Sequence, residues 1–184
     1  MEIENGLYFQ HKDECFLIGD LPEFSPGISR LVYMMEYVRR TTLDAVKGMT
    51  VEQLDTQVLE EGNTIGMLLA HITGIEESYQ GVTFNNTRPS QGLPEHVLGE
   101  SGRRVFSGHP LEWYLDRLAS SRRRTLLELA QKDDDWLYKP YQPWGNKTWD
   151  NNFCWFHVIE DEIRHQGQII ILRKEIAHRL STTS

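Results

Sequence analysis

The sequence predicts an all-α fold, a four-helix bundle within a single domain that spans residues 1–184. Three observations predict this fold class. Four long segments carry apolar residues at the spacing of a helix, the segments between them are rich in Gly, Pro and polar residues, and no stretch alternates apolar and polar residues as a strand does. We expect residues 1–27 to form an irregular leader and residues 28–177 to form the bundle, with long loops between helices two and three and between helices three and four.

The composition is that of an ordinary globular protein, and it excludes several functional classes. A chain of 184 residues with 39% hydrophobic content can bury one substantial core. Its net charge of −8 argues against a nucleic-acid partner, because phosphate-binding surfaces are basic. Two cysteines do not make a disulfide framework, and no segment resembles a secretory signal or a membrane span. We therefore expect a cytoplasmic protein with no membrane partner.

The leader, residues 1–27, contains Gly and Pro without a sustained period, so we expect it to lie across the body of the protein. The pattern then changes, and apolar residues at helical spacing predict the first helix over residues 27–47, ended by Gly48. Thr50, followed three residues later by Gln53, has the pattern of a capping box and predicts a short helical turn.

The second helix is predicted to begin with Asn63 as its N-cap, to carry an apolar stripe, and to fade near Gly81. His71 lies within or beside this stripe. A lone histidine among apolar residues is more often a core residue than a ligand. Glu76 and Glu77 follow it by about one and a half turns, and they either orient the imidazole or face water.

A long connection over residues 83–109, rich in Gly, Pro, Asn and Ser, separates the second helix from the third. The third helix is predicted over residues 110–130, with Pro110 in its first turn. Its basic run, Arg122–Arg124, is explained by a solvated helix face. The next connection, residues 131–147, is dense in aromatic residues that we expect to cover the end of the core.

The fourth helix is predicted from Trp149 to about Ala177, and it carries the most distinctive pattern in the chain. His157, Asp161 and His165 are spaced four residues apart, so they follow one side of the helix at about 6 Å per step. Imidazole and carboxylate are side chains that hold divalent metal ions. The same residues could instead hydrogen-bond one another across the bundle. We favour the metal interpretation because a second helix offers a further ligand.

The spacing limits which of these residues can share an ion. His157 and His165 are separated by about 12 Å along the helix axis, too far for donors that bind at about 2 Å to meet easily. The ion therefore needs an adjacent pair, either His157 with Asp161 or Asp161 with His165. A third ligand must come from another helix, and His71 is the only histidine in another amphipathic segment. Three protein ligands leave positions open, as in catalytic zinc sites.

Two stretches, LLAHITGIEES at residues 68–78 and HVIEDEIRHQGQI at residues 157–169, resemble the DinB-like superfamily of metal-binding four-helix bundles. That superfamily includes bacillithiol S-transferases and the mycothiol-dependent maleylpyruvate isomerase. The likeness covers about residues 25–175. It implies that His71, Asp161 and His165 are the metal ligands. Many members have His where this chain has Asp161, and the isomerase branch has Glu, so a carboxylate is compatible.

The resemblance also implies a function. His157 matches a position that family members often fill with His, and we expect it to line the pocket or support the ligands rather than bind the ion. The ligand set suits zinc or nickel, with iron and manganese also compatible. We expect a metal-dependent thiol S-transferase acting on a small-molecule substrate with a low-molecular-weight thiol. The alternatives are a metal-dependent hydrolase and a non-catalytic metal-binding or interaction module.

Residues 169–172 are more apolar than one buried stripe requires. Some of them are expected either to face a second copy of the chain in a homodimer or to be covered by the leader.

Overall fold

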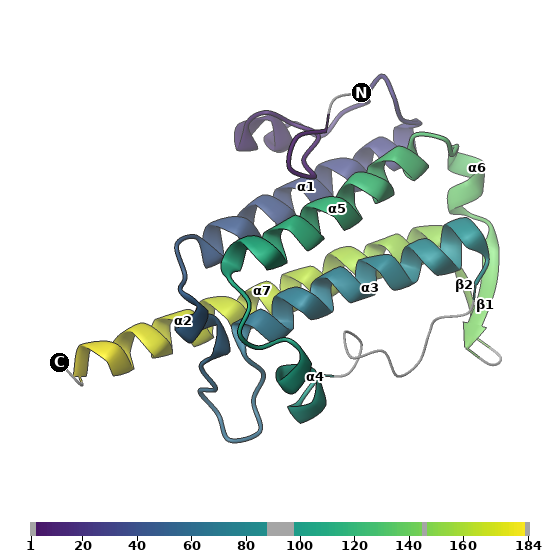
Figure 1. The fold of residues 1–184 in the computed structure, drawn as a ribbon. Coiled ribbons are helices and arrows are strands. Elements are labelled where there is room, and N and C mark those ends of the chain that lie inside the picture. The colour runs from purple at the N-terminus through teal and green to yellow at the C-terminus, as the bar shows by residue number, and fades with distance from the viewer. Residues whose placement is uncertain (1–2, 88–97, 145–146, 183–184) are drawn as a thin grey trace.

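The computed structural model describes residues 3–87, 98–144 and 147–182. Its long helices, which run alongside one another in Figure 1, are α1 (Pro26–Val46), α3 (Ile65–Asn85), α5 (Leu111–Leu129) and α7 (Asn151–Thr182). Helix α7 packs against α1 and α3, and α3 also packs against α5. The predicted all-α class is confirmed, because the described residues are mostly helical.

Shorter elements connect the long helices. They are the 3-10 helix η1 (Lys12–Phe16), the helices α2 (Val51–Asp55), α4 (Glu100–Val105) and α6 (Asp134–Leu137), and the strands β1 (Pro140–Trp144) and β2 (Lys147–Asp150). The antiparallel β1–β2 hairpin, in which Tyr141 pairs with Trp149, was not predicted. Both strands are short and β1 contains two prolines, so no alternation of apolar and polar residues marks them in the sequence.

The helix ends follow local capping chemistry. The predicted capping box is confirmed, because the Thr50 hydroxyl accepts a hydrogen bond from the Gln53 backbone N–H, and the Gln53 side chain accepts one from the Thr50 N–H. The prediction of Asn63 as the cap of α3 was wrong. The cap is Thr64, whose hydroxyl accepts from the Met67 N–H at 3.2 Å, while Asn63 Oδ1 accepts from the Gly99 N–H at 2.8 Å.

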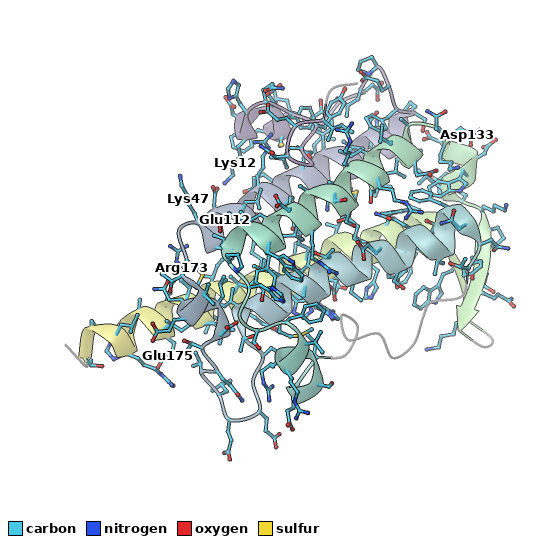
Figure 2. All side chains as sticks on the ribbon, in the orientation of Figure 1. Lys12, Lys47, Glu112, Asp133, Arg173 and Glu175 are labelled. Atoms are coloured by element: carbon cyan, nitrogen blue, oxygen red, sulfur yellow. The ribbon has the colours of Figure 1, made fainter. Side chains whose placement is uncertain are left out.

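Helix α7 is anchored along its length to its neighbours. Near its C-terminal end, Arg173 donates to the backbone carbonyls of Ala45 at 2.6 Å and Lys47 at 3.0 Å, at the end of α1 (Figure 2). These carbonyls have no partner within their own helix, so the guanidinium satisfies them and fixes α7 against α1. No helix in the described part of the chain combines the length and apolar character needed to cross a membrane.

The apolar core forms two clusters with a buried ionic network between them. On each of the four long helices, one fully buried Arg or Glu lies between the buried apolar residues of one cluster and those of the other. These residues are Arg39 on α1, Glu76 on α3, Arg122 on α5 and Glu162 on α7. None of the four side chains is more than 2% exposed, so the network lies in the middle of the helical body.

The two arginines and two glutamates of this network pair completely with one another. Arg39 donates to Glu162 at 2.8 Å and to Glu76 at 2.9 Å, and Arg122 donates to Glu76 at 2.7 Å and to Glu162 at 3.3 Å. The prediction of a solvated face was therefore wrong for Arg122, although Arg123 and Arg124 are exposed. Glu76, one of two residues expected either to orient an imidazole or to face water, instead lies at the centre of the network.

Candidate metal centre

The packing of α3 against α7 brings together the three residues named from the sequence. One ligand atom from each of His71, Asp161 and His165 can be chosen so that all lie within 4.8 Å of one another. Asp161 Oδ1 lies 3.4 Å from His165 Nε2 and 3.8 Å from His71 Nε2. The two imidazole rings are nearly perpendicular, with centroids 4.8 Å apart. Both imidazoles thus direct a nitrogen towards the same carboxylate.

The donor set has the character that a divalent cation requires. His71 and His165 are buried, and the side chain of Asp161 is 15% exposed. Asp161 Oδ2 is buried and has no hydrogen-bond partner among the residues that the structure describes, which is costly for a carboxylate oxygen and would be relieved by a coordinated ion. Nitrogen and oxygen donors of this kind match zinc and similar metals. The residues present therefore fit a metal ion.

A glutamine orients one of the histidines. His165 Nδ1 lies 3.1 Å from Gln168 Oε1, and because an amide oxygen only accepts hydrogen bonds, Nδ1 must carry the proton. This leaves the lone pair on Nε2, the nitrogen that faces Asp161. Such a partner fixes both the tautomer and the ring orientation of a ligand, and its loss typically costs a metal site about 10- to 100-fold in affinity.

The charges within the group are strongly coupled. Burial alone would raise the pKa of Asp161, but hydrogen bonds and charge from His165 and His71 outweigh it and lower that pKa well below its usual range. Burial would likewise lower the pKa of His165, yet the Asp161 carboxylate outweighs it and raises that pKa. Without an ion, a proton on His165 therefore neutralises the buried carboxylate, and a cation must compete with that proton.

His157 does not belong to this group of three. It lies one turn before Asp161 on α7, where its Nδ1 is 3.0 Å from Glu160 Oε2 and its ring meets the ring of Tyr79 edge to face, with centroids 5.7 Å apart. Its side chain is 34% exposed.

Sequence reasoning missed the ionic network that lies beside the candidate metal centre. Glu162 follows Asp161 directly, and its pairing with Arg39 and Arg122 ties this part of α7 to α1 and α5. A signal for this network was present in the sequence. Helical spacing assigns to the core four positions that carry charged residues, namely Arg39, Glu76, Arg122 and Glu162. Charged residues are seldom fully buried unless they are paired, so four such positions on four helices indicate a network.

Comparison with known proteins adds independent findings. A family model described as mycothiol-S-transferase matches residues 30–178, a range that contains all three residues of the candidate metal centre. The crystal structure of a conserved protein from Enterococcus faecalis has the same fold, with a TM-score of 0.65 and 17% sequence identity over 79% of this chain and 94% of the other. No curated protein gives a significant match.

Proposed function

Because the chain belongs to the mycothiol-S-transferase family, a branch of the DinB-like proteins, we propose that it transfers a low-molecular-weight thiol to an electrophilic small molecule at a divalent metal ion held by His71, Asp161 and His165. The observation that carries this proposal is the convergence of two imidazoles on a buried carboxylate, one of whose oxygens has no partner in the described part of the chain. We assign the four long helices to the four-helix bundle of DinB-like proteins. We also place the activity in the cytoplasm, where thiols such as Cys15 and Cys154 stay free.

Each residue of the site has a distinct task. Two neutral imidazoles and one carboxylate hold a divalent ion, zinc or nickel, with a single negative charge from the protein. Such an ion lowers the pKa of a thiol or water that binds it and thereby supplies a nucleophile near neutral pH. Gln168 keeps the His165 lone pair directed at the site, and the burial of His71 and His165 limits access of bulk water.

The proposal is tested with purified protein loaded with zinc or nickel, mixed with mycothiol or bacillithiol and a chromogenic electrophile. We expect conjugation of thiol and electrophile well above the uncatalysed rate, and removal of the ion with a chelator should abolish it. Turnover in the absence of any thiol would instead indicate a metal-dependent hydrolase. No turnover of either kind across a panel of electrophiles would contradict the proposal and leave a non-catalytic metal-binding module.

We expect the affinity for the metal ion to fall as the pH is lowered. The raised pKa of His165 means that its proton begins to compete with the ion above pH 6.5, the ordinary value for histidine. Once His165 is protonated in the metal-free protein, the ion must displace that proton in order to bind. Each further decrease of one pH unit should then lower the affinity about tenfold. Zinc titrations between about pH 8 and about pH 5 measure this slope. An affinity independent of pH over that range would show that His165 is not a ligand.

We also propose that the chain forms a homodimer through the outer face of α7. Of the apolar run noted in the sequence, Ile169 and Leu172 are buried, whereas Ile170 is 39% and Ile171 is 69% exposed. The leader therefore leaves these two side chains uncovered. Replacing Ile171 with Glu should convert a dimer to a monomer in light scattering without changing the helix content. A wild-type protein that remains monomeric at high concentration would refute this proposal.

A further inference from the structure

His157 and Asp161 occupy the same region between α3 and α7. Four residues along a helix correspond to about 6 Å of rise and a small rotation, so both side chains lie on one side of α7. Tyr79 of α3 contacts this region across the α3–α7 interface, because its ring packs edge to face against the ring of His157. Burial first, and then the charges of Cys154 and Asp161, raise the pKa of Tyr79.

The imidazole of His157 is held in one tautomer. Its Nδ1 lies 3.0 Å from Glu160 Oε2, so Nδ1 donates to the carboxylate and the lone pair resides on Nε2. The other oxygen of Glu160 is paired with Arg164, which keeps Glu160 in place. A histidine whose Nδ1–H is bonded to a carboxylate presents the Nε2 lone pair in a fixed orientation, and this is the arrangement that positions general bases in hydrolases and transferases.

The position of His157 also suits proton transfer to solvent. The ring of Phe153 lies parallel to it, with centroids 6.3 Å apart, and the ring of Tyr79 meets its edge. Its side chain is nevertheless 34% exposed, compared with 8% for His71 and 9% for His165. The imidazole is thus fixed in orientation, one helical turn before Asp161 on α7, and open to water.

We propose that His157 is the general base that deprotonates the incoming thiol, an inference that rests on the function proposed above. The S–H bond breaks, its electron pair stays on sulfur, and an N–H bond forms at Nε2 of His157. The sulfur then forms a carbon–sulfur bond with the electrophile, whose leaving group departs with the displaced electron pair. The imidazolium finally returns its proton to water or to the leaving group, so His157 ends the cycle neutral.

The decisive variant is His157→Gln, compared with His178→Gln, which changes an exposed histidine further along α7. We expect His157→Gln to bind zinc with unchanged affinity and to lose about 100-fold or more in kcat, because general bases typically contribute that much. The acidic limb of the pH–rate profile should disappear in this variant and persist in the control. Of the described residues, Glu160 on α7 and Tyr79 on α3 are the titratable groups whose contact with His157 the structure shows, so Glu160→Gln should shift the same limb.

A second measurement does not depend on turnover. In heteronuclear NMR spectra of the zinc-loaded wild type, Nε2 of His157 should be unprotonated before thiol is added and protonated after thiol binds without electrophile. Added imidazole should also restore activity to His157→Ala but not to Asp161→Ala. An active wild type whose rate and pH profile are unaffected by His157→Gln would overturn the role of His157 alone. A wild type that transfers no thiol would overturn both this inference and the proposed function.

Discussion

Replacing Asp161 with Ala is expected to abolish zinc binding and to reduce thiol transfer by more than about 100-fold, a larger effect than the loss of an outer partner of a ligand. The reason is geometric, because Asp161 lies 3.4 Å from His165 and 3.8 Å from His71 and is the only acidic member of the group of three. Zinc in hundredfold excess over Kd should stabilise the wild type by about 2.7 kcal/mol and leave the variant unaffected. Calorimetric zinc titration and thermal unfolding with and without zinc measure both effects.

The matched control for this experiment is Glu175→Ala, which removes a more exposed carboxylate from the same helix (Figure 2). It should bind zinc as the wild type does. If Asp161→Ala retains wild-type affinity, the three residues do not form the metal site. If the variant loses zinc but stays folded and keeps the oligomeric state of the zinc-loaded wild type, a purely structural role for the ion becomes hard to defend.

Replacing Arg122 with Met is expected to lower the free energy of unfolding by about 3–5 kcal/mol, the usual cost of leaving a buried ion pair without one partner. The variant leaves Glu76 and Glu162 buried with only Arg39 to balance two negative charges. Arg124→Met, on the exposed face of the same helix, should change stability by less than about 0.5 kcal/mol. Urea unfolding of the three proteins measures the differences, and a loss below about 1 kcal/mol for Arg122→Met would contradict the expected effect.

The same network predicts a pH dependence of stability. Burial would raise the pKa of Glu76, but Arg122 and Arg39 outweigh it and lower the pKa from 4.5 to about 2. Because the folded-state value is below the unfolded one, the stabilisation from Glu76 is complete above pH 4.5 and is lost as pH falls towards about 2. The unfolding free energy of the wild type should decline through this window, and the decline should be weaker in Arg122→Met.

Much of the helical architecture could be read from local pattern. Apolar spacing placed α1 and α5 to within one residue of their observed ends, because each helix buries one continuous stripe. The end of α3 was misplaced, since Gly81 remains helical and the chain leaves the helix only at Asn86, which has a left-handed conformation with φ of 53°. The hairpin was missed because its pairing depends on cross-strand partners that no local period reveals.

The candidate site likewise combines features that the sequence predicts with features that only the tertiary structure shows. The sequence by itself determined the four-residue spacing of His157, Asp161 and His165, since spacing along a helix is a local property, and it offered His71 as the third ligand. The resemblance then selected Asp161 with His165 as the ligand pair. Only the tertiary structure decided that α3 packs against α7 closely enough for the three donors to converge, and that four charged residues from four helices meet in the core. Such convergence depends on how helices distant in the sequence rotate and pack, which no short segment of the chain encodes.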